Sequence, residues 1–169
     1  MYNKYKEIYL ADGCFWGIQM YFDAITGVVK TEVGYANGNT KNPTYEEVCY
    51  NNTGHVEAVK VLYDPERLGL DKLLSFYYDV IDPVSVNRQG GDVGTQYRTG
   101  IYYIDEADLL VIESSIKELQ KKYDDIIAIE VEVIKNYYPA EEYHQKYLEK
   151  NPHGYCHISR KQIEDVKNM

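Results

Sequence analysis

The stretch EIYLADGCFWGIQMYFDAI, residues 7–25, contains the change of hydrophobic pattern that decides the start of the fold. Residues 7–10 have the composition of a short apolar strand, and apolar residues then recur at the spacing of one helix face as far as Ile25. The stretch therefore predicts a strand that turns into a helix at the pentapeptide Gly13-Cys14-Phe15-Trp16-Gly17.

Cys14 falls at the predicted N-terminus of this helix, where free N–H groups and the helix dipole favour thiolate over thiol. The two flanking glycines allow a tight turn and close approach of a substrate. Phe15 and Trp16 add apolar surface, so the pentapeptide is typical of a nucleophile that opens an apolar pocket. The alternative is a buried structural thiol beside a core aromatic, which is the commoner role of both residue types.

Later segments continue the mixture of strand and helix patterns. Strands are predicted at residues 28–35, 56–63, 100–104 and 127–134. Helices are predicted from Pro43 as first helical residue, at 70–81, at 105–123 after the cap Asp105, at 140–150 after Pro139, and after a weak capping box of Ser159 and Gln162. This order predicts an α+β fold, with helices layered on a sheet.

Length and composition limit the classes of protein that fit. A chain of 169 residues without repeats or linkers predicts one domain, with a polar tail at 151–169 that we expect to be mobile. The net charge of −9, spread along the chain, argues against nucleic-acid and membrane partners. No apolar leader or membrane-length run occurs, so we expect a cytoplasmic protein. We also expect a monomer.

Glu57 is the most informative charged residue. In the strand 56–63 it falls in phase with Val59, Val61 and Tyr63, which directs its carboxyl group to the apolar face. A desolvated carboxyl group retains its proton and can act as a general acid. The alternative is a glutamate at the sheet edge that pairs with a nearby cation.

The long segment from Asp82 to Arg98 lacks hydrophobic periodicity, and a loop of that length inside one domain is usually functional. Its last part, GGDVGTQYR at residues 90–98, combines three glycines with an acid, an amide, a phenol and a guanidinium. These groups could orient a substrate that carries an amide, with a simple turn as the alternative.

Three cysteines are too few, and odd in number, for a secreted disulfide framework. Cys156, on the tail, could attack an oxidised Cys14 as a second thiol. The competing interpretation is a metal site of His153, Cys156 and His157, although zinc normally takes four ligands. Cys49 is most simply a small buried residue.

These segments together resemble the peptide methionine sulfoxide reductase A (MsrA) family along nearly the whole chain. The motif Gly-Cys-Phe-Trp-Gly is unchanged at 13–17. Five further blocks follow in order: NPTYEEVC at 42–49, TGHVE at 53–57, GTQYR at 94–98, YPAEEYHQ at 138–145, and NP with GYC between 151 and 156. Val56 in place of alanine and Gly91 in place of asparagine are the departures, and neither removes a reacting group.

The resemblance implies a two-layer sandwich of helices on a mixed sheet and a reduction of methionine sulfoxide, free or in oxidised proteins, with the S epimer as substrate. It implies no cofactor, and electrons from thioredoxin or another dithiol. The roles that it implies are a nucleophile at Cys14, an acid at Glu57, phenols for the sulfoxide oxygen at Tyr45 and Tyr97, contacts to the substrate methyl group from Phe15 and Trp16, contact to the substrate backbone from Asp92, and a resolving thiol at Cys156.

Two other functions stay open at this stage. A thiol peroxidase also uses a cysteine at a helix start, but it needs an arginine near the thiol, and none adjoins Cys14 in sequence. A non-catalytic module could hold an apolar side chain in the aromatic pocket. A relay through a third thiol could use only Cys49, because no cysteine follows Cys156.

Overall fold

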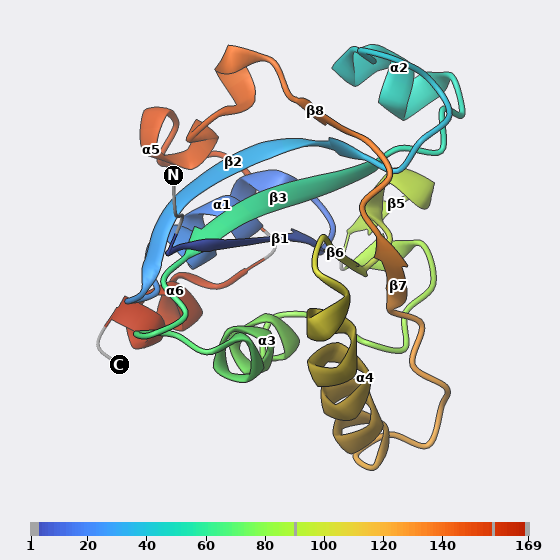
Figure 1. The fold of residues 1–169 in the computed structure, drawn as a ribbon. Helices are drawn as coiled ribbons and strands as arrows, with labels where there is room; N and C mark the ends of the chain where they lie inside the picture. The colour runs from blue at the N-terminus through green and yellow to red at the C-terminus, as the bar shows by residue number, and fades with distance from the viewer. Residues whose placement is uncertain (1–3, 90, 157, 168–169) are drawn as a thin grey trace.

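A six-stranded sheet of order β7-β6-β1-β3-β2-β8 forms the centre of the computed structural model, which describes residues 4–89, 91–156 and 158–167 (Figure 1). Its strands are β1 (Lys6–Ala11), β2 (Val28–Ala36), β3 (Val56–Tyr63), β6 (Gly100–Tyr103), β7 (Glu130–Val133) and β8 (Tyr137–Pro139). Strands β6 and β7 are parallel and the other neighbours antiparallel, so the sheet is mixed.

Helices and short turns connect these strands. The α-helices are α1 (Phe15–Asp23), α2 (Tyr45–Tyr50), α3 (Leu70–Tyr78), α4 (Glu106–Gln120), α5 (Tyr147–Lys150) and α6 (Arg160–Lys167). Two 3-10 helices, η1 (Thr95–Tyr97) and η2 (Glu142–His144), and a hairpin of β4 (Arg88–Gln89) and β5 (Asp92–Val93) complete the described elements. The predicted α+β arrangement, with helices on a central mixed sheet, is confirmed.

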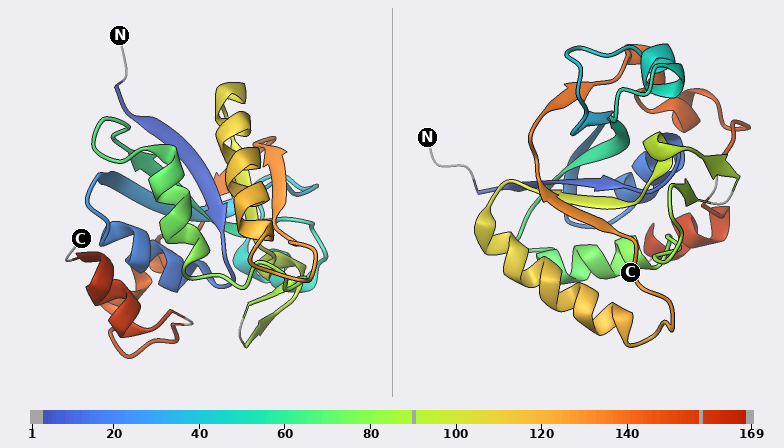
Figure 2. Two further views of the ribbon diagram at one scale, coloured as in Figure 1. Left: turned by 90° about the horizontal axis from the view of Figure 1, so that it is seen from below. Right: turned by 90° about the vertical axis from the view of Figure 1, so that its right-hand side faces the viewer.

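The main core lies between one face of the sheet and the helices. Val59 and Val61 of β3 are fully buried there, together with Ile18 of α1, Leu73 of α3 and Ile112 of α4. Figure 2 shows α3 and α4 side by side, and the two helices pack against each other. Each Å² of apolar surface that is removed from water stabilises the fold by about 25 cal/mol. This layer is therefore the main source of stability.

The opposite face of the sheet has a smaller core under the connection between the two edge strands. Tyr9, Ala58 and Tyr102 are buried on this face, and Ile134 and Tyr137 pack against them. Residues 134–136 carry the chain from β7 across to β8 (Figure 1). Both faces of the sheet are therefore covered where the chain crosses.

The predicted helix at 140–150 is wrong. Pro139 ends β8 and pairs with Gly34 of β2, and the side chain of Gln145 then pairs with the backbone of Val33 through its Oε1 and Nε2 atoms. Lys146 has a left-handed φ of 55°, so regular helix extends only over α5. Tertiary pairing with β2 therefore outweighs the helix start expected at Pro139.

The ends of four further elements also differ from the expectation. The short helix begins at Tyr45, not at Pro43, because Thr44 and Glu47 form a reciprocal capping box. Strand β7 is shorter than the predicted strand 127–134, because only Glu130–Val133 pair with β6. Helices α3 and α4 end at Tyr78 and Gln120, about one turn before their predicted ends.

The C-terminal segment is packed in this structure. Ser159 and Gln162 make the predicted capping box at the start of α6, whose Ile163 and Val166 are buried near α1. Mobility of the tail stays a prediction. Across the part of the chain that the structure describes, no helix combines the length and apolarity needed to cross a membrane.

Candidate active site

The register of the sheet brings four chain segments to one end of it. Ala11, the last residue of β1, pairs with Gly100, the first of β6, and Tyr35 near the end of β2 pairs with Glu57 near the start of β3. Cys14 and Tyr97 lie on the chain within three residues of these strand ends, and Tyr45 begins the helix that follows β2. Residues distant in sequence therefore meet at this end of the sheet.

Cys14 occupies the N-cap position of α1 and is 8% exposed. Its backbone N–H donates to Oδ2 of Asp92 at 3.3 Å. Burial raises the pKa of the Cys14 thiol, and negative charge at Glu57 raises it further, while a backbone hydrogen bond from Trp16 acts in the opposite direction. Desolvation therefore opposes the effect of the helix terminus, which we expected to favour the thiolate.

Glu57 lies on β3 with 1% of its surface exposed, so the inward orientation predicted from strand phase is correct. Its Oε1 accepts a hydrogen bond from the backbone N–H of Phe15 at 3.2 Å. Within the described residues, the buried Oε2 has no hydrogen-bond partner. Burial raises the pKa of Glu57 to about 8, so the carboxyl group is protonated at neutral pH. It is a buried acid with one oxygen available to a ligand.

Tyr45 and Tyr97 place two phenols next to this acid. Tyr45 is the first residue of α2, Tyr97 is the last of η1, and both are partly buried. Burial raises the pKa of both phenols, and the charge of Glu57 contributes to both shifts. Tyr97 also contributes to the raised pKa of Tyr45, so the two phenols lie close to each other. Both hydroxyl groups are therefore protonated donors.

Asp92 connects the loop hairpin with both the helix start and the tail. Its Oδ2 accepts from the Cys14 backbone and from the Tyr155 hydroxyl, the latter at 3.4 Å. Tyr155 directly precedes Cys156 in the chain. The sequence did not predict this link between the long loop and the tail.

The two aromatic residues that follow Cys14 have different exposure. Phe15 is fully buried against Tyr35 and His144, whereas Trp16 is only partly buried. The Trp16 indole stacks on Tyr147 with ring centroids 3.8 Å apart, and its Nε1–H donates to Nδ1 of His144 at 2.9 Å. Trp16 is therefore the member of the pair that offers surface to a ligand.

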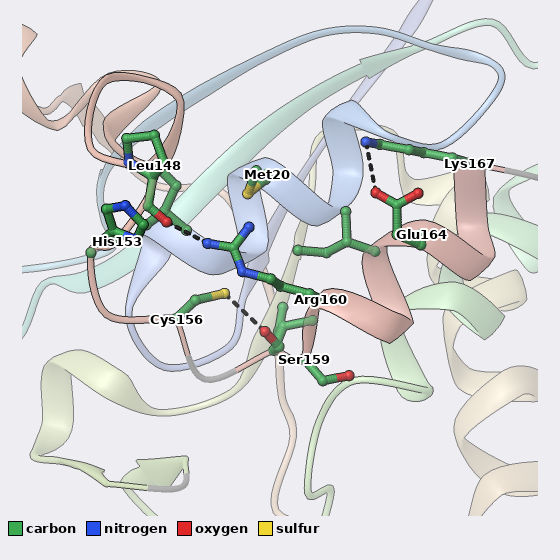
Figure 3. Close-up of a pocket in the computed structure, with 12 residues that line it drawn as sticks. Met20, Leu148, His153, Cys156, Ser159, Arg160, Glu164 and Lys167 are labelled. Atoms are coloured by element: carbon green, nitrogen blue, oxygen red, sulfur yellow. Dashed lines mark hydrogen bonds and ion pairs between the residues drawn. The ribbon is translucent and has the colours of Figure 1, made fainter.

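Cys156 lies beside a cavity of about 610 Å³ that Met20 of α1, Leu148 of α5 and Arg160 of α6 also line (Figure 3). Its thiol donates to the backbone oxygen of Ile158 at 3.0 Å. All three cysteines are free thiols.

The alternative metal site involves His157, which lies outside the described residues. Among the residues that are described, no group of three or more histidine, cysteine and acidic side chains has the arrangement of a metal site. His153 lines the same cavity as Cys156.

Sequence reasoning missed three residues that hold the site together. His144 and Tyr147 support Trp16, and Glu141 accepts from the Tyr45 backbone N–H at 2.9 Å and from the Tyr35 hydroxyl at 2.8 Å. All three belong to the segment wrongly predicted as one helix. The matching block at 138–145 includes Glu141 and His144 but assigned no role to them, and Tyr147 lies just outside it.

Known proteins match this chain over almost its whole length. The family description "Peptide methionine sulfoxide reductase" matches residues 6–169. The peptide methionine sulfoxide reductase MsrA of Lachnoclostridium phytofermentans is 64% identical over 163 residues, which cover 96% of this chain and 98% of the relative.

Solved structures of similar fold include two of Mxr1 from Saccharomyces cerevisiae. The reduced form has a TM-score of 0.87 at 41% identity and covers 94% of each chain. Mxr1 in complex with Trx2 has a TM-score of 0.62 at 29% identity and covers 87% of this chain and 88% of that chain.

Proposed function

Because this chain belongs to the peptide methionine sulfoxide reductase family, an oxidoreductase family that reduces methionine sulfoxide, we propose that Cys14, Glu57 and Cys156 carry out that reduction here. The observation that carries the assignment is the attachment of a buried, protonated Glu57 to the helix turn that holds Cys14. Reduction of a sulfoxide needs a nucleophile for the sulfur and an acid for the oxygen, and Cys14 and Glu57 supply these two groups.

In the first step, the Cys14 sulfur attacks the sulfoxide sulfur while Glu57 protonates the sulfoxide oxygen. The carboxylate that forms accepts the proton of the Cys14 thiol. The oxygen is transferred as hydroxyl to Cys14, so methionine leaves and Cys14 becomes a sulfenic acid. Both groups start protonated, in agreement with the raised pKa values of Glu57 and Cys14.

Tyr45 and Tyr97 stabilise the charge that develops on the sulfoxide oxygen. Their hydroxyl groups are neutral donors beside Glu57. Donors fixed in advance around a developing negative charge cost no reorganisation when the reaction occurs. The half-buried Trp16 receives the substrate methyl group, and the fully buried Phe15 lies behind it.

An asymmetric pocket of this kind selects one sulfoxide epimer. The sulfoxide oxygen points to the phenols and the methyl group points to Trp16, so only one position remains for the third substituent of the sulfur. We assign this arrangement to the S epimer. Asp92 contacts the backbone of the bound residue, so methionine sulfoxide in a peptide is a substrate, and the free amino acid is one too.

In the second step, the Cys156 thiol condenses with the Cys14 sulfenic acid to give a disulfide and water. The tail must rearrange locally, because the Cys156 thiol donates to Ile158 in the reduced state. A dithiol then reduces the disulfide, and thioredoxin is the donor that we propose. The solved complex of the related Mxr1 with Trx2 supports this partner. The proposed cycle needs no cofactor besides this dithiol.

Single-turnover assays on separated epimers test the proposal. Purified reduced protein is mixed with each epimer of a methionine sulfoxide peptide, and methionine formation is followed by rapid quench. Wild type should convert the S epimer, and Cys14→Ser should convert neither. Conversion by Cys14→Ser would sink the assignment, and faster turnover of hydrogen peroxide than of sulfoxide would favour a thiol peroxidase.

A further inference from the structure

The guanidinium of Arg98 joins three segments beside the site. Nη1 donates to the carbonyl of Thr95 at 2.8 Å, Nη2 donates to the carbonyl of Gly54 at 3.0 Å, and Nε pairs with Oε1 of Glu130 at 3.2 Å. The Arg98 side chain is only 17% exposed. Contacts that are shielded in this way are stronger than those of a fully solvated arginine.

Two of the three segments carry residues of the sulfoxide pocket. Thr95 begins the 3-10 turn that ends at Tyr97, so its carbonyl is part of the same single turn. Gly54 lies three residues before Glu57, in the segment that enters β3, and it has a positive φ of 77°. Arg98 therefore holds the Tyr97 turn and the Glu57 strand at a fixed separation.

The third contact fixes the guanidinium itself. Glu130 lies on β7, and its Oε1 also accepts from the Tyr102 hydroxyl at 2.6 Å. Tyr102 is fully buried on β6, so the carboxylate is held by the sheet. A planar guanidinium with donors in three directions satisfies the two carbonyls and the carboxylate together, which the single ammonium of lysine does not.

We propose that Arg98 is a positioning residue for sulfoxide reduction, which sets the separation between the Tyr97 hydroxyl and the Glu57 carboxyl. The inference rests on the proposed function, in which both groups bind the sulfoxide oxygen. Arg98 acts through these groups and does not contact the substrate. Its loss should slow the chemical step and leave the reactivity of Cys14 toward other reagents unchanged.

The test compares two reactions of the same thiol in Arg98→Met. Single-turnover reduction of the sulfoxide should fall by about tenfold or more, because small misplacement of reacting groups costs factors of this size. Alkylation of Cys14 by iodoacetamide, which needs neither Tyr97 nor Glu57, should stay within about twofold of wild type. KM should change little, and Arg98→Lys should restore only part of the rate. The matched control is Arg67→Met, which removes an exposed arginine whose side chain makes no hydrogen bond or ion pair within the described residues and should leave both reactions unchanged.

A second comparison separates positioning from general damage. If Arg98 acts through Tyr97, the double variant Arg98→Met with Tyr97→Phe should be slower than the slower single variant by no more than about twofold. Glu130→Gln keeps the contacts of Arg98 with the two backbone carbonyls, so its single-turnover rate should fall less than that of Arg98→Met. This variant tests the inference even if Arg98→Met folds poorly.

Three results would overturn the inference: a wild-type single-turnover rate in Arg98→Met, equal losses of reduction and alkylation, or effects that multiply in the double variant. Failure of the proposed function has a different signature. In that case Tyr97→Phe or Glu57→Gln alone would leave the rate of sulfoxide reduction unchanged, whatever Arg98→Met does.

Discussion

The carboxyl group of Glu57 accepts a hydrogen bond from the backbone N–H of Phe15 at 3.2 Å, which attaches the buried acid to the first turn of α1. The residue before Phe15 is the candidate nucleophile, Cys14. One short contact between β3 and α1 thus fixes the acid relative to the thiol. Any movement of the start of α1 relative to the sheet would therefore change the position of the thiol relative to the acid.

Replacement of this acid tests its role in the chemical step. Glu57→Gln keeps the size of the side chain and an oxygen that accepts from Phe15, but it removes the transferable proton. The single-turnover rate should fall by about 100-fold, the usual contribution of a positioned general acid, with little change in KM. Rapid-quench measurement of methionine formation checks this. A wild-type rate would mean that another group supplies the proton.

The raised pKa of Glu57 also predicts how stability depends on pH. A folded-state pKa of about 8, against an ordinary value of 4.5, means that the folded protein retains a proton that the unfolded chain loses. The contribution of Glu57 is therefore fully present below the ordinary value and is lost as pH rises through about 8. As the pH rises from below 4.5 to above about 8, the free energy of unfolding of wild type should fall by a few kcal/mol relative to that of Glu57→Gln. The size follows because one pKa unit is worth about 1.4 kcal/mol. Urea unfolding of both proteins at acidic and alkaline pH measures the difference. A constant difference across pH would contradict the buried protonated acid.

Removal of the tail thiol should separate the two halves of the cycle. Cys156→Ser should produce one equivalent of methionine per enzyme and then stop when thioredoxin is the reductant, because the sulfenic acid has no resolving partner. Cys49→Ser keeps a side chain that can bond to Tyr45 and should continue to cycle. Stoichiometric methionine assays and trapping of the sulfenic acid by dimedone check both expectations. Continued turnover of Cys156→Ser would contradict this, and a stalled Cys49→Ser would show a three-thiol relay.

The sequence predicted the parts of the fold that follow local patterns. Strand β3 has the predicted limits, and the buried orientation of Glu57 followed from its phase with Val59 and Val61. The segment 140–150 was wrong because Gln145 pairs with the Val33 backbone, a contact between residues more than a hundred positions apart. The thiolate expectation did not include burial, which depends on what packs over Cys14 and which raises the pKa of its thiol. Supporting residues such as His144 and Glu141 likewise became visible only with the tertiary structure.

The last prediction concerns the support of Trp16. Its indole N–H donates to Nδ1 of His144, a residue that is 1% exposed, so the imidazole is neutral and carries its proton on Nε2. Trp16→Phe retains an aromatic ring over Tyr147 but leaves the buried Nδ1 without its donor. An unsatisfied buried acceptor costs about 1–3 kcal/mol, so the free energy of unfolding should fall by that amount. KM for the sulfoxide should rise, because the ring loses its fixed orientation. His144→Phe removes the acceptor as well, and the double variant should be no less stable than Trp16→Phe alone. Additive losses in stability would show that the two side chains act independently, contrary to the hydrogen bond between them.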